Sequence, residues 1–309
     1  MKGLVYKSTG SWYSVRSETG DMYDCKIKGK LRLKNINSTN PVVVGDIVEF
    51  VVEEHDLQEI GIIQKIQDRR NYILRKSVNL SKQTHILASN IDLLLLVITI
   101  KNPITTTSFI DRFLVSAEAY SVKTILVFNK CDIYDANDEI LLNLFITIYK
   151  SIGYDTIKTS TFSEIGIKEL KKKISGKTIM LGGHSGVGKT SLINSIDTSL
   201  NLKVGNISDQ HFQGKHTTTY AELHDLNNGS KLIDTPGIKG FGLVDFDREE
   251  IKDFFPEFVK LKSKCKFNNC MHLNEPNCYI KQKIQTDEIS KSRYDSYIQI
   301  INDDNLKHR

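Results

Sequence analysis

Apolar runs alternate with amphipathic stretches through the middle of the chain, from about residue 90 to residue 183. The apolar runs predict strands at 92–100, 123–128, 154–160 and 177–183. The stretches between them have a helical period and predict helices near 107–120, 138–151 and 166–174. Strands that alternate with helices are typical of a parallel sheet with crossover helices, so this part of the chain has the pattern of an α/β fold.

The two ends of the chain have different patterns. Residues 1–68 read as short strands without a helical period, separated by turn signals such as Thr9-Gly10 and Gly45-Asp46, which predicts a small closed β-barrel. Beyond about Leu243 the sequence is charged and aromatic and predicts a mainly helical segment, with a helical opening at 248–255. A terminal helix is marked by Ile289, Arg293, Tyr294, Tyr297, Ile298 and Ile301. We therefore predict three domains, at 1–68, 69–243 and 244–309.

Composition and charge narrow the class of protein only a little. The 309 residues carry a net charge of +5, so any nucleic-acid surface must come from local clusters of basic residues. The first residues lack the apolar core of a signal peptide, and the longest apolar run, Leu93–Ile100, falls far short of the roughly 20 residues that cross a bilayer. We expect a cytoplasmic monomer without a membrane partner.

The segment GHSGVGKT, at 183–190, matches the phosphate-loop pattern and lies between a predicted strand and a helical stretch. Its backbone N–H groups would surround the phosphates, Lys189 would reach the β and γ oxygens, and the Thr190 hydroxyl would ligate Mg²⁺. The predicted nucleotide contacts are Gly183, Ser185, Gly186, Val187, Gly188, Lys189, Thr190 and Ser191. A glycine-rich turn that serves packing alone is the alternative, but it needs neither the lysine nor the threonine.

The tetrapeptide NKCD, at 129–132, follows a predicted strand at its carboxyl end, where ligands of open α/β sheets bind. Asp132 can accept hydrogen bonds from the N1–H and amine of guanine, and Asn129 can contact the O6/N7 edge. A match of four letters also occurs by chance. However, Ser160 lies one strand later, where a loop would cover the base, so we predict a guanine site that includes Asn129, Lys130, Asp132 and Ser160.

Two further segments predict the Mg²⁺ and γ-phosphate contacts. In DTPG, Asp234 would be a partner of Mg²⁺, and Gly237 would offer a backbone N–H to the γ-phosphate. In the run 217–219, Thr218 would close onto the metal when the γ-phosphate is present, although three threonines also suit a plain strand. The predicted Mg²⁺ ligands are Thr190, Thr218 and Asp234.

The group that orients the attacking water is less well marked. Position 238 is Ile, whereas signalling GTPases commonly have a Gln there, and an apolar side chain cannot orient water. His216 is the candidate for this role, with an exposed loop histidine as the alternative. The predicted catalytic residues are His216, Lys189 and Thr218.

A Cys/His group in the last segment predicts a metal site. Cys265, Cys270, His272 and Cys278 provide four soft or borderline ligands within a short stretch, enough for a closed tetrahedral Zn²⁺ site. The segment around them has few core residues, so a metal would stabilise its fold. Free cysteines without metal are the alternative, and a disulfide framework is disfavoured by the expected reducing compartment.

Basic residues alternate along one stretch of the N-terminal segment. Cations occupy every second position, at Lys26, Lys28, Lys30, Arg32 and Lys34. An extended strand would place all of them on one face, where they could contact nucleic-acid phosphates, with Trp12, Tyr13 and Tyr23 as stacking surfaces. Arg69 and Arg70 would extend the positive charge. A solvated strand face is the alternative.

The order of these motifs resembles that of a circularly permuted GTPase, since NKCD precedes the phosphate loop. Together with the barrel and the spacing C-x₄-C-x-H-x₅-C, the chain resembles the ribosome small-subunit-dependent GTPase A (RsgA, or YjeQ) family. Segments that carry the resemblance include FIDRFLVSAE (109–118), GKHTTTYAELH (214–224) and CMHLNEPNC (270–278). The departures are small, with Lys215 where Arg is expected and Thr190 where Ser is frequent.

The resemblance implies an oligonucleotide-binding-fold (OB) barrel, a permuted P-loop GTPase domain and a zinc-binding C-terminal domain. It also implies hydrolysis of GTP to GDP with Mg²⁺, stimulated by the small ribosomal subunit, whose RNA and proteins are the expected partners. Two other functions stay open at this point. The chain could be an RNA-binding module that nucleotide only stabilises, or a phosphotransferase, which NKCD and DTPG disfavour.

Overall fold

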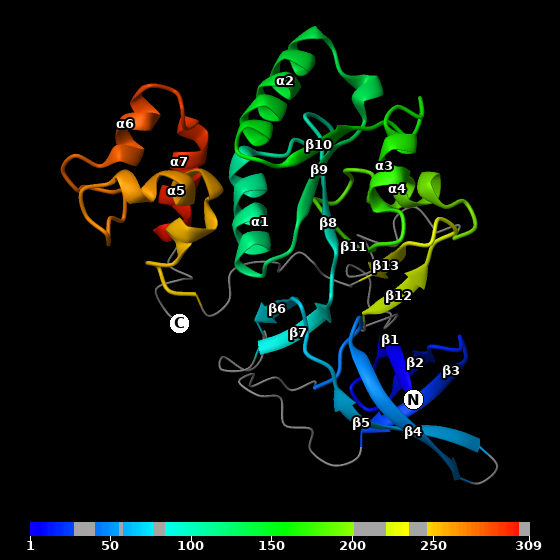
Figure 1. Cartoon of the computed structure of the whole chain (residues 1–309). Coiled ribbons are helices and arrows are strands. Elements are labelled where there is room, and N and C mark those ends of the chain that lie inside the picture. The colour runs from blue at the N-terminus through cyan, green and yellow to red at the C-terminus, as the bar shows by residue number, and fades with distance from the viewer. Residues whose placement is uncertain (28–40, 56–57, 77–83, 201–220, 235–245, 303–309) are drawn as a thin grey trace, which may run out of the picture.

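The computed structural model describes residues 1–27, 41–55, 58–76, 84–200, 221–234 and 246–302 (Figure 1). Three parts follow one another along the chain: a barrel, a sheet covered by helices, and a small helical unit that lies beside helix α1. Within the described residues, no helix is long and apolar enough to cross a membrane.

The N-terminal part is a closed five-stranded barrel, which confirms the OB-like prediction. Its strands are β1 (Lys2–Ser8), β2 (Tyr13–Ser17), β3 (Met22–Ile27), β4 (Ile47–His55) and β5 (Gln58–Ile66). They pair in the order β1-β2-β3-β5-β4, and β4 closes the barrel by pairing again with β1. Alternate positions point inward, so that Val5, Val15, Phe50 and Ile63 are buried together in the barrel core.

The central part is an α/β sheet, as the alternating pattern predicts. Its strands are β8 (Leu93–Ile98), β9 (Thr124–Phe128), β10 (Asp155–Lys158), β11 (Thr178–Gly182), β12 (Glu222–Asp225) and β13 (Lys231–Asp234). They lie in the order β10-β9-β8-β11-β13-β12, and only β12 is antiparallel to its neighbour. Parallel strands end at one edge of a sheet, so the segments that follow them meet there.

Helices cover both faces of this sheet (Figure 1). Helices α1 (Thr107–Ala119) and α2 (Ala136–Ser151) share one apolar core with the even-numbered residues of β8. Helices α3 (Ile167–Ile174) and α4 (Lys189–Ile196) share a second core with the odd-numbered ones. All of β8 is buried because it has a helix layer on each side, which explains its uninterrupted apolar sequence.

A hairpin of β6 (Tyr72–Lys76) and β7 (Thr84–Ser89) lies between the barrel and the sheet, and the sequence pattern did not predict it. The barrel also joins the sheet directly, because Lys7 of β1 pairs with Glu222 of β12. Next to this pairing, the Asp225 carboxylate accepts hydrogen bonds from Tyr6 (2.9 Å) and Arg16 (2.6 Å). The two sheets therefore form one hydrogen-bonded surface.

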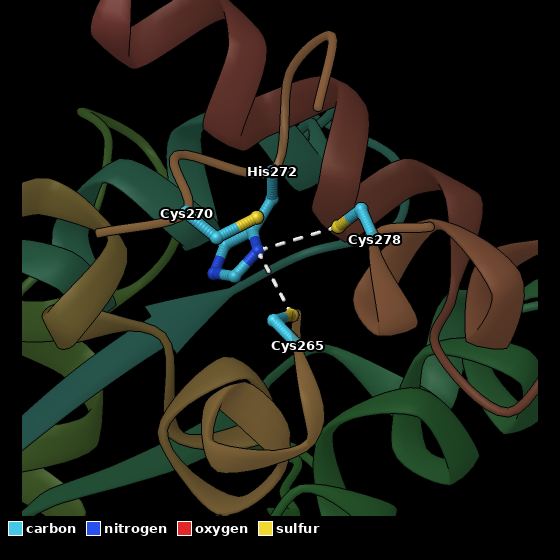
Figure 2. Close-up of side chains that lie close together, drawn as sticks. All are labelled: Cys265, Cys270, His272 and Cys278. Atoms are coloured by element: carbon cyan, nitrogen blue, oxygen red, sulfur yellow. Dashed lines mark hydrogen bonds between the residues drawn. The ribbon is translucent and has the colours of Figure 1, made fainter. Parts of the chain in front are cut away.

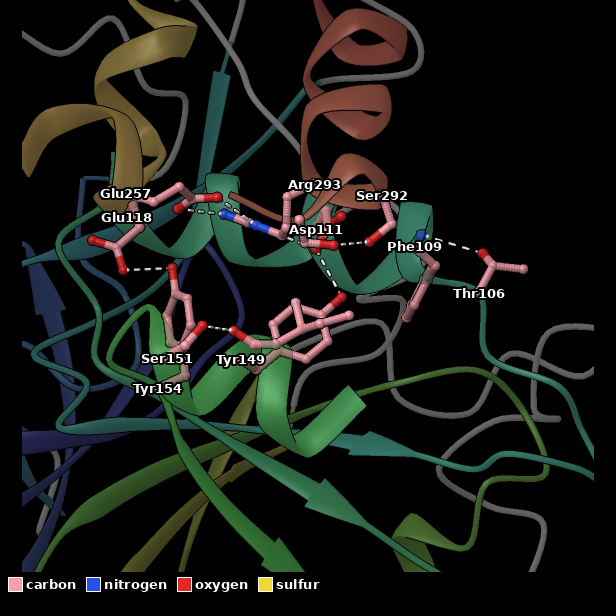
Figure 3. A network of polar contacts seen from close by, with 12 residues as sticks. Thr106, Phe109, Asp111, Glu118, Tyr149, Ser151, Tyr154, Glu257, Ser292 and Arg293 are labelled. Atoms are coloured by element: carbon pink, nitrogen blue, oxygen red, sulfur yellow. Dashed lines mark hydrogen bonds and ion pairs between the residues drawn. The ribbon is translucent and has the colours of Figure 1, made fainter. Parts of the chain in front are cut away.

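The C-terminal part consists of short helices around an apolar core. These are a 3-10 helix (Ile251–Phe254), α5 (Pro256–Leu261), a second 3-10 helix (Lys262–Lys264), α6 (Tyr279–Gln285) and α7 (Lys291–Ile301). The predicted terminal helix corresponds to α7, whereas α6 was not predicted. The unit is anchored by Arg293 of α7, a fully buried arginine that bonds Asp111 of α1 and Glu257 of α5 (Figure 3).

Candidate functional site

The predicted phosphate loop connects β11 to α4 at the carboxyl edge of the sheet. Gly183, Gly186 and Gly188 all have positive φ, at 131°, 82° and 95°. A Cβ on Gly188 would lie 2.5 Å from Nδ2 of Asn129. Glycine is therefore required both for the turn and for the close approach of the loop to NKCD.

The lysine and the threonine of this loop lie where the motif predicts. The Lys189 ammonium donates to the carbonyl oxygens of Gly183 (2.9 Å) and His184 (2.7 Å). It therefore lies against the phosphate loop, where it would contact the phosphates. Thr190 lies in the first turn of α4 and is almost completely buried. A helix N-terminus adds exposed N–H groups and a partial positive charge, both of which favour an anion.

The NKCD segment is hydrogen-bonded directly to this loop. Asn129 donates through Nδ2 to the carbonyl of Val187 (2.9 Å) and accepts through Oδ1 from the Thr159 hydroxyl (3.0 Å). Lys130, in a left-handed conformation, donates to the carbonyls of Gly186 (2.7 Å) and Asn102 (2.6 Å). The predicted base-binding and phosphate-binding elements are thus held together as one unit.

Asp132 and Ser160 also meet, as their separate motifs predict. The Ser160 hydroxyl donates to Oδ1 of Asp132 at 2.5 Å. The same hydroxyl oxygen accepts hydrogen bonds from the backbone N–H groups of Phe162 (3.2 Å) and Ser163 (3.1 Å). The carboxylate is therefore fixed by a loop from the next strand, and no hydrogen bond from the described residues occupies its Oδ2, which can accept further N–H donors.

Some residues of this site carry no motif signal. The Tyr134 hydroxyl donates to the carbonyl of Asn129 (2.6 Å) and accepts from the N–H of Ile100 (2.9 Å), and so it joins the ends of β8 and β9. Thr159 holds Asn129 from the end of β10. Both contacts join residues that follow different strands, and spacing along one sequence does not reveal such contacts.

Asp234 ends β13, which runs parallel to β11, so its carboxylate lies at the same edge as the phosphate loop. Burial raises the pKa of Asp234 above its ordinary value, a cost that a nearby cation would offset. The other predicted γ-phosphate and catalytic residues, His216, Thr218 and Gly237, lie outside the described residues.

A second site gathers the predicted metal ligands in the C-terminal part. Figure 2 shows Cys265, Cys270, His272 and Cys278 pointing toward one point. Their ligand atoms all lie within 4.8 Å of one another, and all four residues are buried. Nδ1 of His272 lies 3.7 Å from Sγ of Cys265 and 3.4 Å from Sγ of Cys278. A tetrahedral zinc site has S···N separations of about 3.6 Å, so the group has the dimensions to hold a metal.

The chemistry of this group also suits a cation. Burial raises the pKa of Cys270 to about 12 and lowers the pKa of His272 to about 4. The imidazole is therefore neutral, as a metal ligand must be, and a bound cation would compensate for the burial of thiolates. The loop is held by Glu275, which accepts from the N–H groups of Met271 and Leu273, and by Tyr294, which donates to the carbonyl of His272.

The predicted basic surface of the barrel is only partly described. Lys26 lies over the ring of the exposed Trp12, with Nζ 4.1 Å from the ring centroid, whereas 28–34 lie outside the described residues. Two expectations were wrong. Tyr13 is 1% exposed and belongs to the barrel core, so it offers no stacking surface. Arg69 is buried in an ion pair with Asp46 (2.6 Å) and adds no free positive charge.

The order of the strands explains how the motifs meet. The β11 strand that precedes the phosphate loop lies beside β8, although β8 to β10 and NKCD come earlier in the chain. A glycine-rich phosphate loop bonded to a guanine-type motif, with an aspartate at the end of the adjacent strand, defines a P-loop GTPase site. Because NKCD precedes the loop, the molecule is a circularly permuted P-loop GTPase.

Comparisons with known proteins agree with this class. Residues 66–244 match the model of the RsgA GTPase family, and residues 2–63 match that of the RsgA N-terminal domain. The chain is 54% identical to the small ribosomal subunit biogenesis GTPase RsgA of Flavobacterium psychrophilum, over 100% of this chain and 95% of that protein. It is 53% identical to the protein of the same name from Christiangramia forsetii, over 100% and 98%.

Solved structures show the same likeness over the whole chain. The crystal structure of YjeQ from Thermotoga maritima superposes with a TM-score of 0.79 at 33% identity, and covers 100% of this chain and 99% of that one. YloQ, described as a circularly permuted GTPase, gives 0.74 at 28% identity, over 99% and 94%. The chain belongs to the RsgA GTPase family, and it is therefore an enzyme that hydrolyses GTP.

Proposed function

We propose that this GTPase acts in biogenesis of the small ribosomal subunit, as the names of its relatives state for those proteins. The observation that carries the enzymatic part is the direct bonding of NKCD to the phosphate loop, through Asn129 to Val187 and Lys130 to Gly186. The assignment of the small subunit as partner rests on sequence identity to those relatives along the whole chain. The proposed domains are a barrel at 1–68, a GTPase domain at 69–243 and a zinc-binding domain at 244–309.

In the proposed site, the base and the phosphates are bound by different elements. Asp132 accepts the N1–H and amine of guanine, while Ser160 fixes that carboxylate, and Asn129 and Lys130 hold the base loop on the phosphate loop. Residues Gly183 and Ser185 to Ser191 surround the phosphates, with Lys189 on the β and γ oxygens. Bound Mg²⁺ would neutralise phosphate charge, and Thr190, Thr218 and Asp234 would hold it.

The proposed catalytic group is His216, which would orient the attacking water, with Lys189 and Thr218 at the γ-phosphate and the N–H of Gly237 beside it. These assignments come from the motif order and from the absence of a glutamine at position 238. A supplied finger or an ordered switch raises GTPase rates about 10³- to 10⁵-fold in general. The small subunit is proposed to supply such an effect here.

The other two domains would hold the enzyme on its partner. We assign zinc to the group of Cys265, Cys270, His272 and Cys278, because three thiolates and one imidazole suit a structural Zn²⁺. On the barrel, the strand face that begins at Lys26 is proposed to contact ribosomal RNA phosphates, with Trp12 available to stack on a base.

Sedimentation with purified subunits tests the proposal. The protein, with GDP or a non-hydrolysable GTP analogue, should sediment with small subunits and not with large ones. Phosphate release in multiple turnover should rise in the presence of small subunits only. Equal stimulation by both subunits would contradict the proposed partner, whereas labelled γ-phosphate on any acceptor except water would contradict hydrolysis.

A further inference from the structure

A groove lies between α3 and α4, on the face of the sheet opposite α1 and α2 (Figure 1). Its volume is about 650 Å³, many times the ~30 Å³ that one water molecule occupies in the liquid, so it has room for an extended ligand. Lys168 and Lys171 of α3 lie along one wall. The opposite wall belongs to α4 and the residues after it, and has the neutral polar side chains of Asn194, Ser195 and Thr198.

The basic wall follows from the sequence of α3, IKELKKKI. The buried residues of this helix are Ile167, Leu170 and Ile174. The lysines between these positions therefore point away from the core, and Lys168, Lys171 and Lys172 share one side of the helix because they are three and four positions apart. At 1.5 Å per residue, these three cations lie within about 6 Å along the helix axis.

Ion pairs do not neutralise this wall. Among the described residues, no carboxylate lies within 4.0 Å of the ammonium groups of Lys168, Lys171 and Lys172. In contrast, Lys173 of the same helix pairs with Asp155 at 3.4 Å. Of the described residues that line the groove, Glu164 alone is acidic, and it lies in the loop that follows Ser160. The groove and its edge therefore carry an excess of positive charge.

The acidic residue that follows α4 does not offset this charge. Asp197 is 3% exposed, and its carboxylate accepts hydrogen bonds from Ser199 (2.6 Å) and Asn227 (2.6 Å). Although burial opposes the change, these bonds and the charge of Lys171 lower the pKa of Asp197. Neutral donors therefore occupy the carboxylate, and the Lys171 ammonium can contact a ligand in the groove.

A row of ammonium groups opposite a neutral polar wall suits a chain of phosphates. Lysines contact nucleic-acid backbones as point charges, without reading the bases, and displace counterions when they bind. The phosphates of the bound nucleotide do not need these lysines, because Lys189 and the N-terminus of α4 already serve them. The proposed partner offers another source of phosphates, the backbone of its RNA.

We propose that the groove between α3 and α4 is a second RNA-binding surface, in which Lys168, Lys171 and Lys172 contact phosphates of small-subunit RNA. The proposal rests on the proposed function, which supplies the partner, and adds a contact from the GTPase domain to that of the barrel. RNA in this groove lies against α4, the helix that begins at the phosphate loop. The subunit then touches the domain that hydrolyses GTP directly.

Three full-length proteins test this proposal: the wild type, Lys168→Ala/Lys171→Ala, and the control Lys150→Glu, which has the same net charge as the double variant. Lys150 is exposed at the end of α2, on the other face of the sheet. Binding to purified small subunits is measured with a non-hydrolysable GTP analogue over a series of KCl concentrations. The double variant should lose roughly 1.4 to 1.8 of the log–log slope, at 0.7 to 0.9 for each phosphate contact, and the control should keep the wild-type slope.

Two control measurements are made without subunits. Melting temperatures and GDP affinities should match for all three proteins, because the substituted lysines lie outside the core and outside the phosphate loop. A double variant that loses GDP affinity would assign the lysines to the nucleotide and overturn the proposal. A double variant that binds GDP normally and keeps the wild-type salt slope would also overturn it, and would leave the proposed function intact.

Cross-linking identifies the molecule that fills the groove. A photoreactive amino acid at position 168 of the full chain should label RNA when the protein is bound to small subunits. Labelling of ribosomal protein alone would overturn the proposal, since the groove would then hold a protein partner. A wild type that does not bind small subunits would overturn the proposed function and the RNA-binding groove together.

Discussion

Asp132 is the residue on which base selectivity is expected to depend. In Asp132→Asn, the amide would present an N–H donor where guanine presents its own, so GTP affinity should fall by about 1–3 kcal/mol. Xanthosine triphosphate, which has a carbonyl in place of the amine, should be bound in preference. Competition binding with the two nucleotides measures the change. Asp135→Asn, at the exposed N-cap of α2, should leave the preference for GTP as it is.

His216 is the residue to which we assign the attacking water. Loss of a group that positions or accepts a proton costs about 10²- to 10⁴-fold in rate in general, so His216→Ala should lower subunit-stimulated turnover by at least that lower factor. GTP affinity should change little, and the protein should accumulate on small subunits. A variant with full stimulated activity would remove His216 from the mechanism.

For single residues, the sequence predicted the members of the nucleotide-binding motifs better than the residues that hold those motifs in place. Asp132 and Ser160 meet as expected because each belongs to a known spacing beside a strand end. Tyr134 could not be predicted, since it bonds main-chain groups just beyond the ends of two different strands. Arg69 was misread because its partner, Asp46, is 23 positions away and is buried only in the folded chain.

Among the secondary-structure elements, length decided what could be predicted. The strands β8 to β11 and helices α1 to α3 lie within a few residues of their predicted ranges, because each has a sustained apolar period. The β6–β7 hairpin and α6 were missed, since both are short and depend on contacts with the rest of the molecule. The group of Cys265, Cys270, His272 and Cys278 could be predicted because its four members lie close together in the sequence.

Folding of the loop that ends at Cys278, and of the helices around it, should depend on bound metal. We expect one zinc per chain, and Cys270→Ser should unfold the region around 246–302 while GTP binding is largely kept, because the two sites lie in separate parts. Elemental analysis and hydrogen exchange measure the two effects. Cys131→Ala should keep its zinc, since Cys131 lies outside the group. Native protein without metal would refute the assignment.

For the whole molecule, α1 is the element that touches both the nucleotide site and the C-terminal part. The Phe109 ring of α1 packs against the His184 ring of the phosphate loop, with centroids 3.7 Å apart and the ring planes tilted by 31°. Two residues later, Asp111 bonds Arg293 of α7 at 2.8 Å (Figure 3). A shift of α1 would therefore change contacts both at the phosphate loop and at α7.

Arg293→Ala should loosen the C-terminal part, because Asp111 and Glu257 would remain as buried carboxylates without their cation. Removal of one partner of a buried ion pair costs about 3–5 kcal/mol. Chemical denaturation should show a loss of that size in the free energy of unfolding. Arg248→Ala, which removes an exposed hydrogen bond to Asn302, should change the free energy of unfolding by about 0.5 kcal/mol or less.

The barrel surface should determine how binding to the subunit responds to salt. Changing Lys26, Lys28 and Lys30 to Glu should weaken binding and flatten its salt dependence, because each lost phosphate contact removes roughly 0.7 to 0.9 of the log–log slope. GTP hydrolysis without subunits should barely change. An unchanged slope would indicate that these lysines do not contact RNA phosphates and only form a solvated strand face.

The permuted strand order also has a consequence for the nascent chain. Synthesis proceeds from the N-terminus, so β8, β9 and β10 emerge before β11, the strand that pairs with the free edge of β8. Until then this edge of a fully apolar strand is open, and such an edge favours aggregation. Nucleotide cannot help at that stage, since the phosphate loop has not yet been made. Packing of α1 and α2 covers one face of β8, so the edge itself is paired only when β11 has been made.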